Sequence, residues 1–145
     1  MTVESRKPIV VGVDGSADAR RALEWAMDES KQSGAPLLLI HGVDVGVAAA
    51  SPYGSGTVLQ QLEEAGEQVL AEELARVRAT GIEADGRIEV GSAAYALIEA
   101  SRGARMLVVG SRGHGGFTGM LLGSVSSACS HHAHCPVVVV RPPDK

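Results

Sequence analysis

The chain has 145 residues and a formal net charge of −4, with 45% apolar, 21% charged and only 3% aromatic residues. This length suits one domain over residues 1–145, and the acidic balance and the few aromatic rings argue against a surface that binds nucleic acid. No apolar run reaches the roughly 20 residues of a membrane-spanning helix, no secretory leader is visible, and two cysteines make no disulfide framework, so we expect a cytoplasmic protein with no membrane partner.

Short apolar runs rich in β-branched residues alternate with amphipathic helical patterns. Residues 8–13 and 36–43 are apolar on both faces, which is typical of strands buried between two layers of helices. Between them, Ser16 is expected to cap a helix that ends at Gly34. Residues 44–57 are rich in Gly, Ala and Ser and predict a loop.

The second half of the chain continues this alternation. In order, it predicts a helix over 58–77 closed by Gly81, a less buried strand over 82–90, a short helix over 92–102, a strand over 106–109, a glycine-rich loop over 110–123, a helix over 124–133 and a strand over 136–140. Five strands separated by helices predict a Rossmann-like α/β fold, an open parallel sheet with helices on both faces.

The last predicted strand contains four consecutive valines. At the edge of a sheet such a strand would expose apolar side chains and unpaired backbone groups, which a second copy of the chain can cover. We therefore expect a homodimer that forms through the strand at residues 136–141.

The stretch from 109 to 126 carries the clearest chemical signal. It leaves a buried strand, passes through glycines that allow a ligand to approach the main chain, and enters a helix whose first N–H groups suit phosphate. Ser124 and Ser126 add hydroxyl donors. The stretch is not a Walker A loop, because Leu122 and Gly123 stand where a lysine is required before Ser124.

The spacing of Gly110, Gly113, Gly123 and Ser124, with two and nine residues between the glycines, resembles the glycine pattern of the universal stress protein family. Residues 9–16, 22–26 and 135–141 resemble other segments of that family, so the likeness covers nearly the whole chain. The resemblance implies a sheet ordered 3-2-1-4-5, with ATP between the first and fourth strands. The sequence itself does not indicate a metal at the phosphates, but we expect Mg²⁺ to accompany them because of the ATP in cells.

The resemblance also implies a role for each site residue. It places Asp14 on the ribose hydroxyls, Gly12 and Val13 near base and sugar, Gly42 or Val43 on the adenine edge, Val109 and Gly110 along the adenosine, and Arg112, Gly113, Gly123, Ser124, Val125 and Ser126 around the phosphates. At Gly42 the family often has valine, so we expect one apolar wall of the base pocket to be missing.

Three of these assignments have plainer alternatives. Asp14 before Gly15 is a common turn pair, Gly110 and Gly113 can serve only to shape the loop, and Arg112 can be a solvated charge.

Four residues near the end of the chain invite a metal interpretation: His131, His132, His134 and Cys135. Because no other ligand completes a tetrahedral set, and histidines suit a helix end, we expect no metal there. Cys129 is expected in the core, and His114 is expected to make a loop contact rather than act as a general base.

The function that the resemblance implies is an ATP-binding switch in the stress response, with slow ATP hydrolysis at most. The missing lysine and the lack of a placed base argue against an enzyme. Two alternatives stay open: a slow ATPase or phosphotransferase, and a dimeric interaction module that binds no nucleotide. Other adenine nucleotides, AMP among them, also stay open as ligands.

Overall fold

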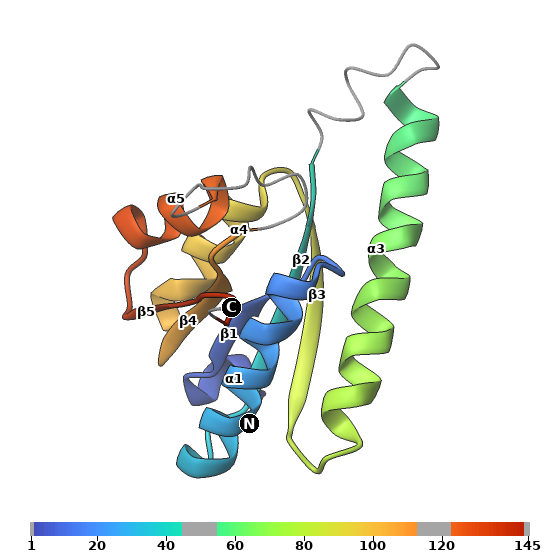
Figure 1. Cartoon of the computed structure of the whole chain (residues 1–145). Helices are drawn as coiled ribbons and strands as arrows, with labels where there is room; N and C mark the ends of the chain where they lie inside the picture. Colours follow the sequence, from blue (N-terminus) through green and yellow to red (C-terminus); the bar gives the residue numbers. More distant parts are fainter. Residues whose placement is uncertain (1, 45–54, 113–122, 144–145) are drawn as a thin grey trace.

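A computed structural model describes residues 2–44, 55–112 and 123–143 of the chain. It has five parallel strands in the order β3-β2-β1-β4-β5 (Figure 1). They are β1 (Ile9–Gly12), β2 (Leu37–Val43), β3 (Ala84–Val90), β4 (Met106–Gly110) and β5 (Val137–Val140). The helices are α1 (Ala17–Ser33), α3 (Ser55–Arg78), α4 (Ala93–Ala100) and α5 (Ser124–His132), with short 3₁₀ turns at η1 (Glu4–Arg6) and η2 (Ser101–Gly103). The predicted strand order and fold class are confirmed.

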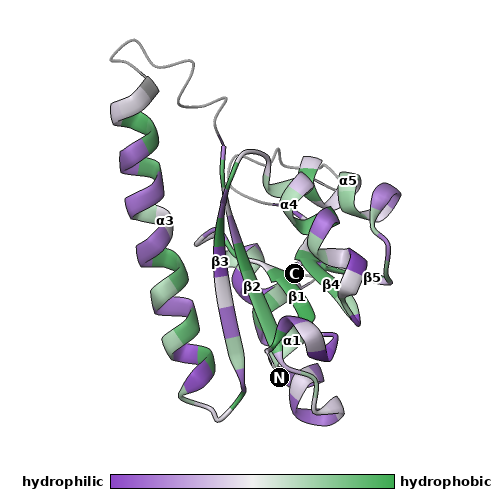
Figure 2. Cartoon of the chain, turned by 180° about the vertical axis from the view of Figure 1, so that it is seen from behind, coloured by the Kyte–Doolittle hydropathy of each residue, from purple (hydrophilic) through white to green (hydrophobic). Residues whose placement is uncertain are grey.

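Alternate residues of the central strands fill two separate cores. Ile9 and Val11 belong to the core under α1 and α3, whereas Val10 belongs to the core under α4 and α5, and all three are fully buried. Burying one such side chain contributes roughly 1.5–3 kcal/mol. Figure 2 shows the inner strands in green between helices with purple outer faces. The strands are therefore apolar on both sides because helices cover both sides.

Local signals fix most helix ends. The Ser16 hydroxyl accepts a hydrogen bond from the Ala19 amide at 3.1 Å, and Gly34, with φ of 80°, ends α1 through a bond to the Ser30 carbonyl. Gly81, with φ of 88°, follows α3 in the same left-handed conformation. These three predictions are confirmed.

The predicted loop over 44–57 is too long at its end. Residues 55–57 belong to α3, which begins at Ser55, so the helix starts before its first large apolar residue, Val58. Hydrophobic periodicity reveals only the part of a helix that packs, and the first turn of α3 offers no such pattern. None of the helices in the described ranges combines the length and apolar character that a bilayer crossing requires.

The strand order reverses between β1 and β4, which pair directly, with Ile9 opposite Met106. The helix after β1 joins one core and the helix after β4 joins the other. The two connections therefore separate at the carboxyl ends of these strands. In open parallel sheets this is where ligands bind.

Candidate functional site

The turn after β1 is tightly organised around Asp14. The Val13 amide donates to the Ile40 carbonyl at 2.9 Å, and the Ser16 amide donates to Asp14 Oδ1 at 2.8 Å. Gly15 takes the positive φ, 81°, that this tight turn requires. Asp14 is thus a turn residue and is also held, half-buried, at the edge where β1 and β4 end.

Gly12 and Gly42 face a helix rather than open space. A Cβ at Gly12 would lie 3.1 Å from Leu97 Cδ1, and one at Gly42 would lie 2.5 Å from Ala93 Cα. The expectation of a missing apolar wall at Gly42 is therefore wrong: the first residue of α4 occupies the space that a valine side chain would need. Val43 is buried, and its carbonyl already accepts a bond from the Gly91 amide at 2.8 Å.

His41 lies beside the candidate site, although its sequence position alone did not point to this place. Its Nδ1 donates to the Val13 carbonyl at 2.8 Å, directly before Asp14. The ring lies against Gly66 of α3, where a Cβ would come within 2.5 Å of the imidazole. The sequence feature that could have indicated His41 is that it is the one polar ring in the otherwise apolar strand predicted over 36–43. His41 thereby links β1, β2 and α3 beside the turn that carries Asp14.

The end of β4 is set by close packing against α1. Val109 is buried, and a Cβ at Gly110 would lie 2.8 Å from the backbone carbon and oxygen of Asp18. Gly110 is therefore required for packing, whatever else it does. The next residue, Ser111, donates its amide to the Val140 carbonyl at 3.0 Å, which ties this point to β5.

The start of α5 returns to the same point. The Gly123 amide donates to the Ser111 carbonyl at 2.6 Å, so the connection from β4 to α5 begins and ends at one place. Gly123 is the N-cap and offers no side chain to the helix, whose first internal bond runs from the Ser127 amide to the Gly123 carbonyl. The N–H groups of Ser124 and Val125 precede that bond, in the position that attracts anions.

The two serines of this helix start differ. Ser124 is exposed, whereas Ser126 is 2% exposed and its hydroxyl lies within hydrogen-bond distance of the carbonyls of Ser111 (3.0 Å) and Gly123 (3.2 Å). The expectation that Ser126 offers its hydroxyl to a phosphate is therefore wrong. That hydroxyl holds the two ends of the connection together, and Val125 packs half-buried against the core beneath.

Arg112 is not a solvated charge. Its Nε lies 3.3 Å from Asp18 Oδ2 on the first turn of α1. This ion pair joins the segment after β4 to the helix after β1. Gly113 and His114 lie outside the described residues.

The cysteines and histidines near the end of the chain are explained by burial in the core and by bonds within α5. Burial, and secondarily the nearby Cys135, raise the pKa of the Cys129 thiol to about 11, as suits an inert core residue. His131 Nδ1 donates to the Ser127 carbonyl at 2.8 Å within α5. Across the three described ranges, no three His, Cys, Asp or Glu side chains come together as a metal site.

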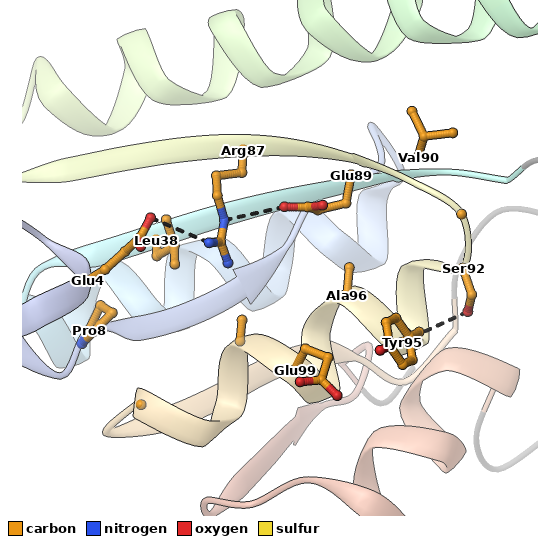
Figure 3. A pocket seen from close by; sticks show the side chains of 13 residues that line it. Glu4, Pro8, Leu38, Arg87, Glu89, Val90, Ser92, Tyr95, Ala96 and Glu99 are labelled. Carbon is orange, nitrogen blue, oxygen red and sulfur yellow. Dashed lines mark hydrogen bonds and ion pairs between the residues drawn. The ribbon is translucent and has the colours of Figure 1, made fainter.

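A pocket of about 420 Å³ lies elsewhere, between β3, α4 and the N-terminal turn (Figure 3). Arg87 projects into it and pairs with Glu4 at 3.4 Å and Glu89 at 3.7 Å. The described residues that line this pocket include none of the predicted site residues. The pocket is therefore separate from the candidate site at β1 and β4.

The doubly wound sheet and the connection at its switch point define a Rossmann-like α/β protein. The chain belongs to the universal stress protein family, whose model matches residues 5–141.

One relative, a universal stress protein of Mycolicibacterium smegmatis, is 42% identical over 141 residues, which cover 96% of this chain and 47% of the relative. The chain spans about half the length of the curated relatives it matches.

Several similar solved structures contain a nucleotide, and two of them are compared with this chain. One is a universal stress protein in complex with cAMP, with 28% identity, a TM-score of 0.68, and coverage of 94% of this chain and 98% of that one. The other is an Arabidopsis thaliana family protein with AMP bound, with 24% identity, a TM-score of 0.70, and coverage of 94% and 92%. The second is a likeness of fold alone.

Proposed function

We propose that this chain binds an adenine nucleotide where β1 and β4 end, and that the nucleotide is a regulatory ligand in a stress response. The observation that carries the proposal is the bond from the Gly123 amide to the Ser111 carbonyl. This bond brings the N-terminus of α5 to the end of β4, so the helix amides and the strand end could meet the same ligand. Asp14, in the adjacent turn, is the candidate partner of the ribose. The family member that binds cAMP supports this class of ligand.

ATP is the nucleotide that we propose. Arg112 and the first amides of α5 provide positive charge and hydrogen-bond donors, which suit a chain of phosphates. The Mg²⁺ that accompanies ATP would meet the exposed hydroxyl of Ser124. The nearby Asp18 carboxylate is already bound by two arginines, so the phosphates themselves would supply most of the oxygen ligands.

The described residues at the phosphate end favour binding over catalysis. The carboxylate of Asp18 is paired, and His131 is bonded near the far end of α5. Neither is placed to activate a water molecule toward a phosphate. We therefore assign the nucleotide a role in conformation or partner choice, with hydrolysis slow at most.

The direct test is to identify by mass spectrometry what the purified protein releases on denaturation, and to titrate it with ATP, AMP and cAMP by calorimetry. We expect an adenine nucleotide to be released and ATP to bind. Gly123→Val should weaken ATP binding by more than the roughly 10- to 150-fold that one charge-assisted hydrogen bond is worth, because the side chain blocks the phosphate. Gly103→Val is the control, since no atom outside its own stretch of backbone lies within 4 Å of its Cβ position. A wild-type chain that neither releases nor binds a nucleotide would refute the proposal in favour of an interaction module.

We further propose that the chain forms a homodimer through β5 and its flanks, residues 136–141. The two edges of the sheet differ in chemistry. On β3, Arg87 and Glu89 carry charge, which discourages pairing with another strand. On β5, all four residues are valines that remain half-exposed. An apolar edge of this kind suits a second copy of itself.

Val138→Lys tests the dimer, because it places a charge in the middle of the valine edge. We expect sedimentation velocity to show a dimer for the wild type and a monomer for this variant. Val90→Lys is the matched control, since Val90 is 52% exposed on the opposite edge strand and its replacement should leave the dimer intact. A Val138→Lys chain that stays dimeric would contradict the β5 interface.

A further inference from the structure

A buried carboxylate binds arginines from both sides of the β1–β4 switch point. The side chain of Asp18 is 10% exposed, on the first turn of α1. Its Oδ1 binds Arg21 Nη1, one turn further along the same helix, and its Oδ2 binds Arg112 Nε at 3.3 Å. Arg112 comes from the segment after β4. The Asp18–Arg112 pair thus links the two connections that border the proposed nucleotide site.

Backbone packing fixes the geometry of this pair. Because Gly110 has no side chain, the backbone of Asp18 comes against the end of β4, where a Cβ would be 2.8 Å away. Arg112 follows Gly110 by two residues and reaches the carboxylate from there. Packing against β4 therefore fixes the position of Asp18, and Asp18 in turn fixes the position of the Arg112 side chain.

The contact leaves most of the guanidinium available. This contact engages Nε, one of five N–H donors, and among the described residues it leaves the four donors of the two terminal amino groups in a planar fork that matches phosphate. Arg21 binds the other carboxylate oxygen, and the three side chains together carry one net positive charge. The cluster can therefore face an anion even though it contains an aspartate.

We infer that Asp18 is a positioning residue of the nucleotide site: it holds Arg112 by Nε so that the terminal amino groups meet the phosphates. This inference rests on the proposed function. Asp18 does not touch the ligand. It reduces the conformational freedom that Arg112 would otherwise lose when the nucleotide binds, and so raises affinity for phosphates but not for adenosine.

The test compares ATP with adenosine by calorimetry on the full chain. Asp18→Asn should weaken ATP binding about five- to tenfold and leave adenosine binding unchanged, because only phosphates meet Arg112. In an Arg112→Ala background, Asp18→Asn should have no further effect on ATP affinity, since the two residues act through one contact. Asp28→Asn is the matched control: it removes the same charge from an exposed position on the same helix and should change neither affinity.

Several results would overturn the inference. One such result is an ATP affinity in Asp18→Asn that is unchanged, or tighter because Asp18 competes with phosphate. Another is an equal loss of affinity for ATP and adenosine, which would indicate a general structural role. A third is that the effects of Asp18→Asn and Arg112→Ala on ATP affinity add. If wild type binds neither ligand, the proposed function itself fails. If wild type binds both and Asp18→Asn behaves as wild type, only the positioning role fails.

A second variant covers the case in which Asp18→Asn does not fold. Arg112→Lys keeps the charge but cannot be held by Nε while presenting a fork. We expect it to lose several-fold in ATP affinity with adenosine binding unchanged. Wild-type ATP affinity in Arg112→Lys would show that a point charge suffices and would refute positioning.

Discussion

The candidate site has two halves, one at the ends of β1 and β2 and one between β4 and α5, and glycines have different roles in them. In the β1–β2 half, Gly12 and Gly42 face α4, and the Val13 amide and carbonyl are already bonded to Ile40 and His41. In the β4–α5 half, the helix begins at Gly123 without a side-chain cap, and Arg112 adds a cation. The first half is a packed floor, and the second presents donors and charge. Substitutions in the first half should therefore change stability, and substitutions among the exposed groups of the second should change affinity.

The largest change in stability is expected from Gly42→Val, in the β1–β2 half. The new Cβ would lie 2.5 Å from the Ala93 backbone, so α4 must shift. We expect a loss of about 3 kcal/mol in the free energy of unfolding, measured by urea denaturation. Gly103→Val, in open space, should lose far less. A Gly42→Val chain of wild-type stability with tighter nucleotide binding would restore the idea that valine serves as a wall of the base pocket.

Ser126→Ala tests the one buried hydroxyl that we assign a structural role in the β4–α5 half. This hydroxyl joins the ends of the β4–α5 connection, and its removal costs one hydrogen bond, although the carbonyls of Ser111 and Gly123 each keep an amide donor. The free energy of unfolding should fall by about 0.5–1.5 kcal/mol, the net contribution of one hydrogen bond. Ser126→Thr keeps the hydroxyl and separates its loss from a change of packing. Unchanged stability together with weaker ATP binding would mean that the hydroxyl serves the ligand after all.

Ser124→Ala should have the smallest effect on stability, because the residue is exposed. We expect its free energy of unfolding to stay within about 0.5 kcal/mol of wild type. ATP affinity should fall by roughly two- to tenfold, as one hydroxyl contact predicts, while adenosine affinity stays constant. The comparison of the two halves breaks down if Ser124→Ala loses stability and keeps its ATP affinity.

Most of the fold was predictable because it depends on local and periodic signals. Runs that are apolar on both faces predicted buried parallel strands, and Ser16, Gly34 and Gly81 marked helix ends through their own backbone chemistry. The start of α3 was missed because its first turn has no apolar face. Register between distant strands is not visible in a single sequence without a family likeness.

The site was predictable as a set of positions but not as a set of contacts. Gly42 was misinterpreted because its neighbour, Ala93, is distant in sequence and close only in space. Arg112 and Asp18 are separated by 94 positions, and nothing local connects them. The resemblance placed Ser126 among the phosphate contacts, whereas here its hydroxyl bonds within the connection itself. Tertiary packing decides each of these cases.

The central place of β1 also shapes how the protein is made. Ile9 leaves the ribosome well before its partner Met106 on β4. Such long-range pairing slows folding, and the proposed nucleotide site cannot exist on the nascent chain before β4 has docked. A nucleotide that binds the proposed site would therefore stabilise the folded protein and would not guide the earliest steps of its folding.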